Sequence, residues 1–191
     1  MARRLPHQYP RDKWLFITWN LAGSLPLMRY PPPDHLGAGH AFVWMDRYLD
    51  TTAFGPKYLA QERIAAIVRA ALDKGAQLGH YELRAWVIMP NHVHVLLLPK
   101  ISPIRLMQAL KGTSAREANR LLRRTGTRFW QSESYDHWVR DQREFDRIVR
   151  YIESNPVNAG LVGKVEEFRW SSGNAEMSLG VARMSACSTM E

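Results

Sequence analysis

Runs of apolar residues predict two neighbouring strands in the middle of the chain. Tyr81 to Met89 and His92 to Leu98 are rich in β-branched, aromatic and leucine residues, a composition typical of strands. Pro90 and Asn91 between them form a turn pair, so the two segments are expected to pair as an antiparallel hairpin. Trp14 to Leu21 and Tyr135 to Arg140 have the same character and are expected to be strands as well.

Apolar residues at helical spacing predict two helices on either side of this hairpin. One covers Gln61 to Lys74, and Gly75 follows it as a stop signal. The other begins after Ser102, with Pro103 at its first position, where proline is well tolerated.

A third helix is predicted after Asp141, which suits the N-cap position. Its apolar residues have the spacing i, i+3, i+4, i+7 and are Phe145, Ile148, Val149 and Ile152. Proline disfavours helical geometry in the residue before it. Pro156 is therefore expected to end this helix at Asn155.

Three segments lack such periodicity. Residues 22–58 contain five prolines and are expected to form a long irregular excursion with a short helix near Trp44 to Leu49. Residues 1–13 are expected to form a basic arm. Residues 173–191, rich in Ser, Gly, Ala and Met, are expected to form a flexible tail.

Composition narrows the class of protein. The 191 residues are 46% hydrophobic and carry a net charge of +8, which favours a polyanionic partner, nucleic acid before membrane. The single cysteine, Cys187, excludes an intrachain disulfide framework and a Cys-rich zinc site. The basic start is followed by no apolar stretch, so we expect no signal peptide, no membrane association and a cytoplasmic location.

The positive charge is concentrated between Lys100 and Arg150, where twelve Lys or Arg side chains stand against six acidic ones. Arginine pairs with phosphate and aromatic rings stack on unpaired bases, which favours nucleic-acid binding over a merely solvated helix face. The residues expected to contact DNA are Lys111, Arg116, Arg120, Arg123, Arg124, Arg128, Trp130 and Arg147.

Two histidines are candidates for metal binding. His92 and His94 are two apart in a predicted strand, so both imidazoles point to one face, about 7 Å apart at ~3.3 Å per residue. Such a pair can share one divalent ion. A pair of histidines at a polar sheet edge is the alternative.

A tyrosine lies beside the apolar stripe of the third helix. At 3.6 residues per turn, Arg147, Tyr151 and Asn155 follow one another along one flank. A phenol can attack a phosphodiester, and an arginine or a metal can polarise the phosphate. A boundary tyrosine with its hydroxyl in water is the alternative on geometry alone.

These residues resemble a known family. Pro90-Asn91-His92-Val93-His94 is similar to the His-hydrophobe-His motif of the HUH endonucleases. Tyr151 to Val157, followed by Ala159 to Val162, resembles the tyrosine motif of the REP-associated tyrosine transposases, a branch of the single-tyrosine transposase superfamily. Phe129-Trp130-Gln131 and Tyr135 to Arg140 also look like that branch. The resemblance covers about residues 14–172, in the expected order.

The resemblance implies an α+β fold, with a single antiparallel sheet and packed helices, related to the ferredoxin-like and RRM-like folds. It implies a divalent metal, Mg²⁺ or Mn²⁺, held by His92 and His94, with Asn155 as a further ligand. Tyr151 would cut single-stranded DNA through a 5′-phosphotyrosine, leaving a free 3′-hydroxyl. The implied substrates are DNA hairpins from repetitive palindromes, bound by a monomer or a homodimer.

Other interpretations stay open at this point. Tyr135, beside Asp136 and His137, is a rival nucleophile. A second alternative is that the chain is a domesticated, non-catalytic protein that binds hairpin DNA or RNA. A metallohydrolase or phosphoesterase would need more carboxylate or histidine ligands than the sequence shows.

Overall fold

The computed structural model describes residues 12–25 and 38–174, and of residues 38–44 the backbone only. Its strands form one antiparallel sheet in the order β2-β3-β1-β4. The strands are β1 (Leu15–Asn20), β2 (Tyr81–Ile88), β3 (His92–Pro99) and β4 (Tyr135–Trp138). All four strands predicted from the sequence are confirmed, and so is the hairpin, with Ile88 paired to Val93.

Four α-helices and two short 3-10 helices accompany the sheet in the described part of the chain. They are α1 (Ala38–Thr51), η1 (Tyr58–Ala60), α2 (Glu62–Gln77), α3 (Pro103–Leu121), α4 (Gln142–Asn158) and η2 (Val165–Glu167). The connections β1 to β2 through helices, β2 to β3 through a turn, and β3 to β4 through α3 give the βαββαβ order of ferredoxin-like folds. The α+β class with a single antiparallel sheet is thus confirmed.

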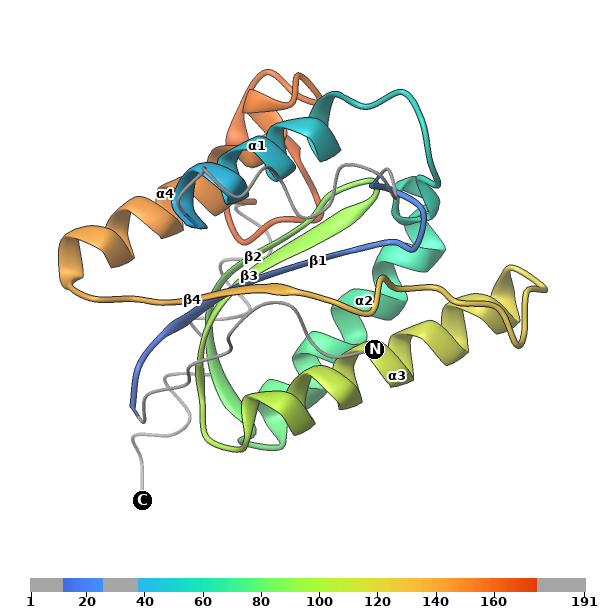
Figure 1. Ribbon diagram of the computed structural model, residues 1–191, viewed down its shortest axis with the longest axis horizontal. Coiled ribbons are helices and arrows are strands. Elements are labelled where there is room, and N and C mark those ends of the chain that lie inside the picture. Colours follow the sequence, from blue (N-terminus) through green and yellow to red (C-terminus); the bar gives the residue numbers. More distant parts are fainter. Residues whose placement is uncertain (1–11, 26–37, 175–191) are drawn as a thin grey trace.

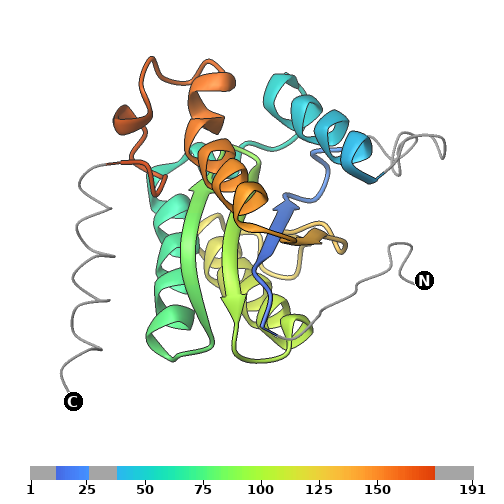
Figure 2. The same cartoon turned by 90° about the vertical axis from the view of Figure 1, so that its left-hand side faces the viewer.

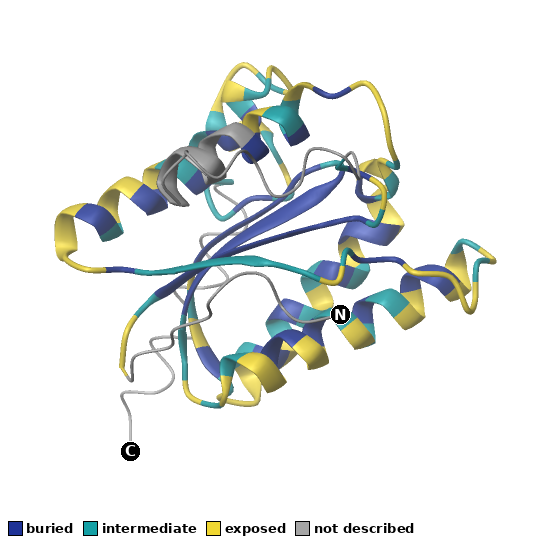
Figure 3. Ribbon diagram, viewed as in Figure 1, coloured by how far each residue is buried: buried dark blue, intermediate teal, exposed yellow. Residues whose placement is uncertain are grey.

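The helices lie in two layers, one on each face of the sheet. Helices α2 and α3 cover one face, and α1 and α4 cover the other (Figures 1 and 2). Strand side chains alternate between the faces: Ile17, Trp19 and Val95 join the core under α2 and α3, while Phe16 and Leu96 join the core under α1 and α4. The two central strands, β1 and β3, are therefore buried on both faces (Figure 3).

Helix α4 begins as expected and ends later than expected. The Asp141 carboxylate accepts a hydrogen bond from the Glu144 N–H at 2.8 Å, which confirms the N-cap. The prediction that the helix stops at Asn155 is wrong. Pro156 lies in the last turn, where its missing N–H costs one bond only, and the Ala159 N–H still donates to the Asn155 carbonyl at 2.9 Å.

Helix α2 also continues beyond its predicted end, through Gly75 to Gln77. Gly75 is buried because Tyr81 of β2 packs directly on it: a Cβ there would lie 2.6 Å from the Tyr81 ring. The Tyr81 hydroxyl donates to the Leu72 carbonyl at 2.6 Å. This glycine serves the contact between helix and sheet rather than a helix stop.

The segment after α4 returns to the sheet. Ser171 bridges to Val87, and the Ile88 N–H donates to the Trp170 carbonyl at 2.8 Å, so this segment covers part of the free edge of β2. Of the arm and tail predicted from the sequence, residues 1–11 and 175–191 lie outside the described residues, as do residues 26–37 of the excursion.

Candidate functional site

The two histidines of β3 point to the same face, as strand alternation requires. Both side chains are fully buried, and their Nε2 atoms lie 3.0 Å apart. They face the layer of α1 and α4, beside Phe16, whose ring stacks on His94 with centroids 5.6 Å apart. Two imidazole nitrogens thus meet at one point inside the protein.

The other nitrogen of each ring is held by a neighbouring side chain. Thr18 Oγ1 lies 2.7 Å from His94 Nδ1, and Asn91 Oδ1 lies 2.7 Å from His92 Nδ1. The amide nitrogen of Asn91 donates to the Leu49 carbonyl at 2.9 Å, which fixes the direction of the amide. Because an amide oxygen only accepts, the His92 proton belongs on Nδ1, and the lone pair on Nε2 is available to a metal.

The electrostatics agree with a neutral His92. Burial, together with the neighbouring His94, lowers the pKa of His92 to about 3, against a smaller opposing effect of Asp46. The ring is therefore uncharged at neutral pH, which is the form that binds metals.

Helix α4 brings Tyr151 and Asn155 to the histidine pair. The Tyr151 ring lies edge-on to Phe16 and to His94, with centroids 6.0 Å and 5.7 Å away. Asn155, one turn later, is buried. The structure thus brings together Tyr151, Asn155, His92 and His94, the four residues predicted to perform the chemistry.

Helix α1 adds a residue that sequence analysis missed. Asp46 is buried, and its Oδ1 lies 3.0 Å from His94 Nε2 and 3.7 Å from His92 Nε2. Its Oδ2 accepts hydrogen bonds from the Tyr151 hydroxyl and from the Asn155 amide, the latter at 3.4 Å. Burial alone would raise the pKa of Asp46, but His94, His92 and Asn155 hold it below the usual value, so the carboxylate is charged.

A second carboxylate lies beside the first. Asp50 Oδ1 is 3.7 Å from His92 Nε2. Burial and the charge of Asp46 raise the pKa of Asp50 to about 7, against a smaller opposing effect of His94. Asp46 and Asp50 are four apart, so they share one face of α1. That spacing was visible in the sequence, but only the fold shows that this face meets the histidines.

The donor atoms at this point fit a divalent metal. One ligand atom each of Asp46, His92 and His94 lies within 4.8 Å of the others. The buried Oδ1 atoms of Asn155 and Asp50 have no hydrogen-bond partner among the described residues, although buried polar atoms are nearly always paired. Two imidazoles with carboxylate and amide oxygens form a donor set that can hold a divalent metal ion.

The basic residues predicted to contact DNA lie elsewhere. Most of them are on α3 and the loop after it, and α3 covers the other face of the sheet (Figure 1). Arg116, Arg120, Arg123 and Arg128 are exposed. Lys111 donates to the carbonyls of Ser132 and Glu133 at 3.0 and 3.3 Å, and Arg124 lies over the Tyr58 ring.

Two of the residues predicted to contact DNA, Trp130 and Arg147, have surroundings that differ from the prediction. Trp130 is buried, lies edge-on to Trp19, and donates its indole N–H to Ser114 at 3.0 Å. Its ring is a core element and presents no face to a base. Arg147 is exposed and pairs with Glu144 at 3.2 Å, so it does not extend the row of Tyr151 and Asn155 into the buried site.

Tyr135, the rival nucleophile, lies on β4 opposite Thr18. Its ring is 6.3 Å from Phe16, and burial, Asp136 and Glu144 raise its pKa, against a smaller opposing effect of Arg140. His137, its suggested base, instead bonds Glu144 at 3.1 Å. The geometry favours Tyr151 because that hydroxyl bonds a carboxylate beside the histidine pair.

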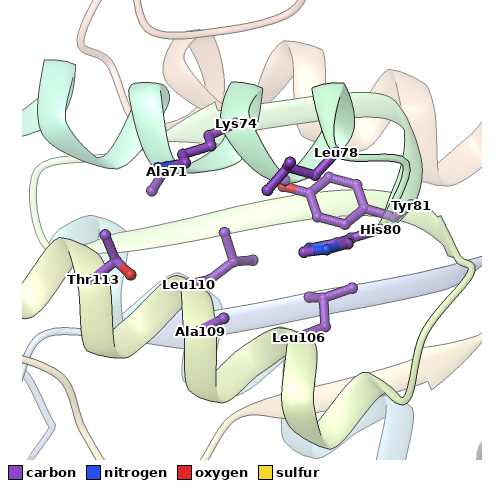
Figure 4. A pocket seen from close by; sticks show the side chains of 10 residues that line it. Ala71, Lys74, Leu78, His80, Tyr81, Leu106, Ala109, Leu110 and Thr113 are labelled. Carbon is purple, nitrogen blue, oxygen red and sulfur yellow. The ribbon is translucent and has the colours of Figure 1, made fainter.

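A cavity of about 140 Å³ lies between α2 and α3. Figure 4 shows that Leu106, Leu110 and Leu78 line it together with His80 and Tyr81. None of the residues that line it belongs to the histidine site, and it lies on the opposite face of the sheet. It is therefore a separate feature.

Comparisons with known proteins agree with the family resemblance. The family model described as "Transposase IS200 like" matches residues 40–155. A REP-associated tyrosine transposase of Escherichia coli (strain K12) is 24% identical over 117 residues, 60% of this chain and 68% of that protein. A solved structure of a REP-associated tyrosine transposase bound to a REP hairpin has the same fold, with a TM-score of 0.63 and 17% identity over 94% of this chain and 88% of that chain. Among the described helices, none is long and apolar enough to span a membrane.

Proposed function

The chain belongs to the family of IS200-like transposases, and on that premise we propose that it cuts and rejoins single-stranded DNA with Tyr151 as the nucleophile. One observation carries the proposal. The Tyr151 hydroxyl bonds the Asp46 carboxylate, whose other oxygen lies 3.0 Å from His94. A nucleophile, a proton acceptor and metal ligands therefore meet at one buried point.

The proposed reaction is a transfer of a phosphoryl group to tyrosine. The Tyr151 oxygen attacks the phosphorus of a DNA phosphodiester, and the bond from phosphorus to the 3′-oxygen breaks. The tyrosine becomes a 5′-phosphotyrosine, and the leaving 3′-oxygen takes up a proton to become a hydroxyl. Attack of a 3′-hydroxyl on the phosphotyrosine reverses these steps and joins the strands.

Asp46 assists the nucleophile in this proposal. A phenol with a pKa near 10 is mostly neutral at pH 7 and has to lose its proton as it attacks. Asp46 Oδ2 already accepts the hydrogen bond of that hydroxyl and is placed to receive the proton. Phe16 holds the Tyr151 ring edge-on at 6.0 Å, which limits its orientations.

His92, His94, Asp46 and Asn155 would hold the divalent metal, Mn²⁺ or Mg²⁺. A bound metal polarises a phosphoryl oxygen and stabilises the negative charge of the transition state. The donor geometry supports this ligand set, because the imidazoles are held by Thr18 and Asn91 and the Asn155 oxygen has no hydrogen-bond partner in the described part of the chain.

The proposed substrate is hairpin DNA with a single-stranded flank. The solved relative is bound to a REP hairpin, and this chain has a net charge of +8. The exposed arginines of α3 supply a surface that can pair with phosphates.

The test is a search for the covalent intermediate. The protein is incubated with 5′- and 3′-labelled hairpin DNA and Mn²⁺, and SDS-resistant adducts are separated on a gel. The proposal expects the fragment 3′ of the cut to remain on the protein, and to be lost in Tyr151→Phe. Tight hairpin binding without any adduct would contradict it and favour a non-catalytic hairpin binder.

A further inference from the structure

The connector between α1 and α2, residues 52–61, joins two regions that the sheet separates. Helix α3, which carries exposed arginines, lies on one face of the sheet, and helix α4, which carries Tyr151, lies on the other (Figure 1). A DNA strand that touches both has to pass an edge or an end of the sheet. The connector runs past the end where β1 stops and β3 starts, because the Leu59 N–H donates to the Pro90 carbonyl at 3.1 Å.

The connector is held in place by its backbone. The Phe54 N–H donates to Thr52 Oγ1 at 3.2 Å. Gly55 has φ +88°, and a Cβ there would lie 2.8 Å from the Gly23 carbonyl oxygen. The turn is therefore packed against the end of β1 with no room for a side chain at Gly55.

This held turn displays an aromatic ring to solvent. Phe54 is 82% exposed, and it is the only exposed Phe, Tyr or Trp among the residues whose burial the structure describes. The other large exposed hydrophobic residues there, such as Leu78, are aliphatic. An exposed ring on a turn that is packed in place keeps most of its surface in solvent and is available to stack on a planar partner.

The connector carries one cation, Lys57, and contacts another, Arg124. Lys57 lines a cavity of about 30 Å³ together with Asp50 and Asn91, and both of these lie beside His92. The Arg124 guanidinium, from the loop after α3, lies 4.7 Å from the centroid of the ring of Tyr58 in the connector, and the Tyr58 ring stacks on Phe129. The connector thus links the arginines that follow α3 to the histidine site.

We propose that the connector is the binding surface for the unpaired DNA strand next to the cut, with Phe54 stacking on a base and Lys57 pairing with a neighbouring phosphate. Single-stranded DNA is the partner because an exposed ring suits only bases that are not already stacked, and flanking cations suit phosphates. The inference rests on the proposed function for the position of the cut, but not for the binding itself.

The experiment measures binding in EDTA, so that it does not depend on catalysis. The probes are a blunt DNA hairpin and the same hairpin with a single-stranded flank that contains 2-aminopurine. Phe54→Ala is expected to lower affinity for the flanked hairpin about tenfold, within the range of stacking one base, and to leave the blunt hairpin within twofold. Phe54→Trp is expected to retain affinity for the flanked hairpin, and stacking on the ring is expected to quench the fluorescence of the 2-aminopurine in the flank.

Matched controls and Lys57 complete the design. Leu78→Ala removes another exposed apolar side chain, far from the connector in the sequence, and is expected to change neither affinity. For the flanked probe, Lys57→Gln is expected to flatten the plot of log affinity against log salt concentration, with a slope smaller in magnitude by about 0.7. Lys100→Gln is expected to leave this slope unchanged. Equal affinities of Phe54→Ala and the wild type, or equal losses on both probes, would overturn the proposal. If the wild type forms no covalent adduct but the variants bind the two probes as expected here, only the proposed function would be contradicted.

Discussion

The hydroxyl of Tyr151 donates a hydrogen bond to the carboxylate of Asp46, which ties helix α4 to helix α1 beside the histidine pair. The two residues are 105 positions apart in the chain. Asp46 therefore has two neighbours at once: the candidate nucleophile through Oδ2 and the candidate metal ligand His94 through Oδ1. The site is assembled from three elements, α1, β3 and α4, and depends on all of them.

Tyr151→Phe is expected to abolish the covalent adduct and to leave hairpin binding nearly unchanged. The change removes one hydroxyl and keeps the ring that packs on Phe16 and His94. Adduct formation is followed on SDS gels and binding by fluorescence anisotropy. Tyr135→Phe is the control, since it removes the rival hydroxyl; an adduct that persists in Tyr151→Phe and disappears in Tyr135→Phe would reverse the assignment.

Loss of a histidine is expected to be more damaging than loss of Asn155. His92→Ala or His94→Ala removes a nitrogen ligand from the cluster, and each should abolish cleavage. Asn155→Ala removes a neutral oxygen that water can replace, so cleavage should fall less and recover partly at high Mn²⁺. Cleavage rates against Mn²⁺ concentration give the ranking. Full activity of either histidine variant, or of the wild type in EDTA, is incompatible with a metal site here.

Asn91→Ala is expected to weaken Mn²⁺ binding about 10- to 100-fold, the usual effect of removing a partner of a metal-ligating histidine. The substitution removes the oxygen that holds His92 Nδ1 and the link to the Leu49 carbonyl. Calorimetry measures the affinity, and ¹⁵N NMR of the metal-free protein reports the His92 tautomer. Asn158→Ala, an exposed asparagine of α4, is the control. An unchanged tautomer and affinity in Asn91→Ala would show that Asn91 does not orient the ring.

Asp50→Asn is expected to stabilise the metal-free protein by an amount that increases as the pH rises. The folded pKa of Asp50, about 7, lies above its ordinary value of 3.8, so folding costs free energy once the group has to ionise. That cost is absent below pH 3.8, grows as the pH rises from 3.8 to 7, and is complete above 7, with an upper limit of about 4 kcal/mol at 1.36 kcal/mol per unit.

Melting temperatures in EDTA at pH 5 and pH 8 test this. The gain of Asp50→Asn over the wild type should be larger at pH 8, by several degrees at roughly 3 °C per kcal/mol. Added Mn²⁺ should reduce the difference, because a cation near His92 favours the ionised carboxylate. A gain that is equal at both pH values would contradict the raised pKa.

Arg120→Gln combined with Arg123→Gln is expected to flatten the dependence of DNA affinity on salt. Each lost phosphate contact lowers the log–log slope by about 0.7 on single strands, so the pair should lower it by up to about 1.4. The matched control is Lys100→Gln with Arg169→Gln, two cations already paired with Glu82 and Glu62. An unchanged slope in the variant that lacks Arg120 and Arg123 would place the DNA elsewhere.

Local signals in the sequence determined the strands, three of the helices, the core of the fourth near Trp44 to Leu49 within α1, and four residues of the site. The strands followed from β-branched and aromatic runs, and the N-cap of α4 from Asp141. His92 and His94 face one side because strand side chains alternate, and Tyr151 and Asn155 face one side because they are one helical turn apart. The two-residue and four-residue spacings fix these directions whatever the rest of the chain does.

Only the tertiary structure decided which of these faces meet and what else joins them. Asp46 and Asp50 belong to an excursion with weak local signals, and their role depends on α1 packing against β3 and α4. Trp130 reads as a base-stacking residue in the sequence, but its ring fills the core beside Trp19. The type of a side chain shows that it can bind DNA or metal. Whether it is placed to do so depends on its burial and its neighbours, which are set by contacts between distant parts of the chain.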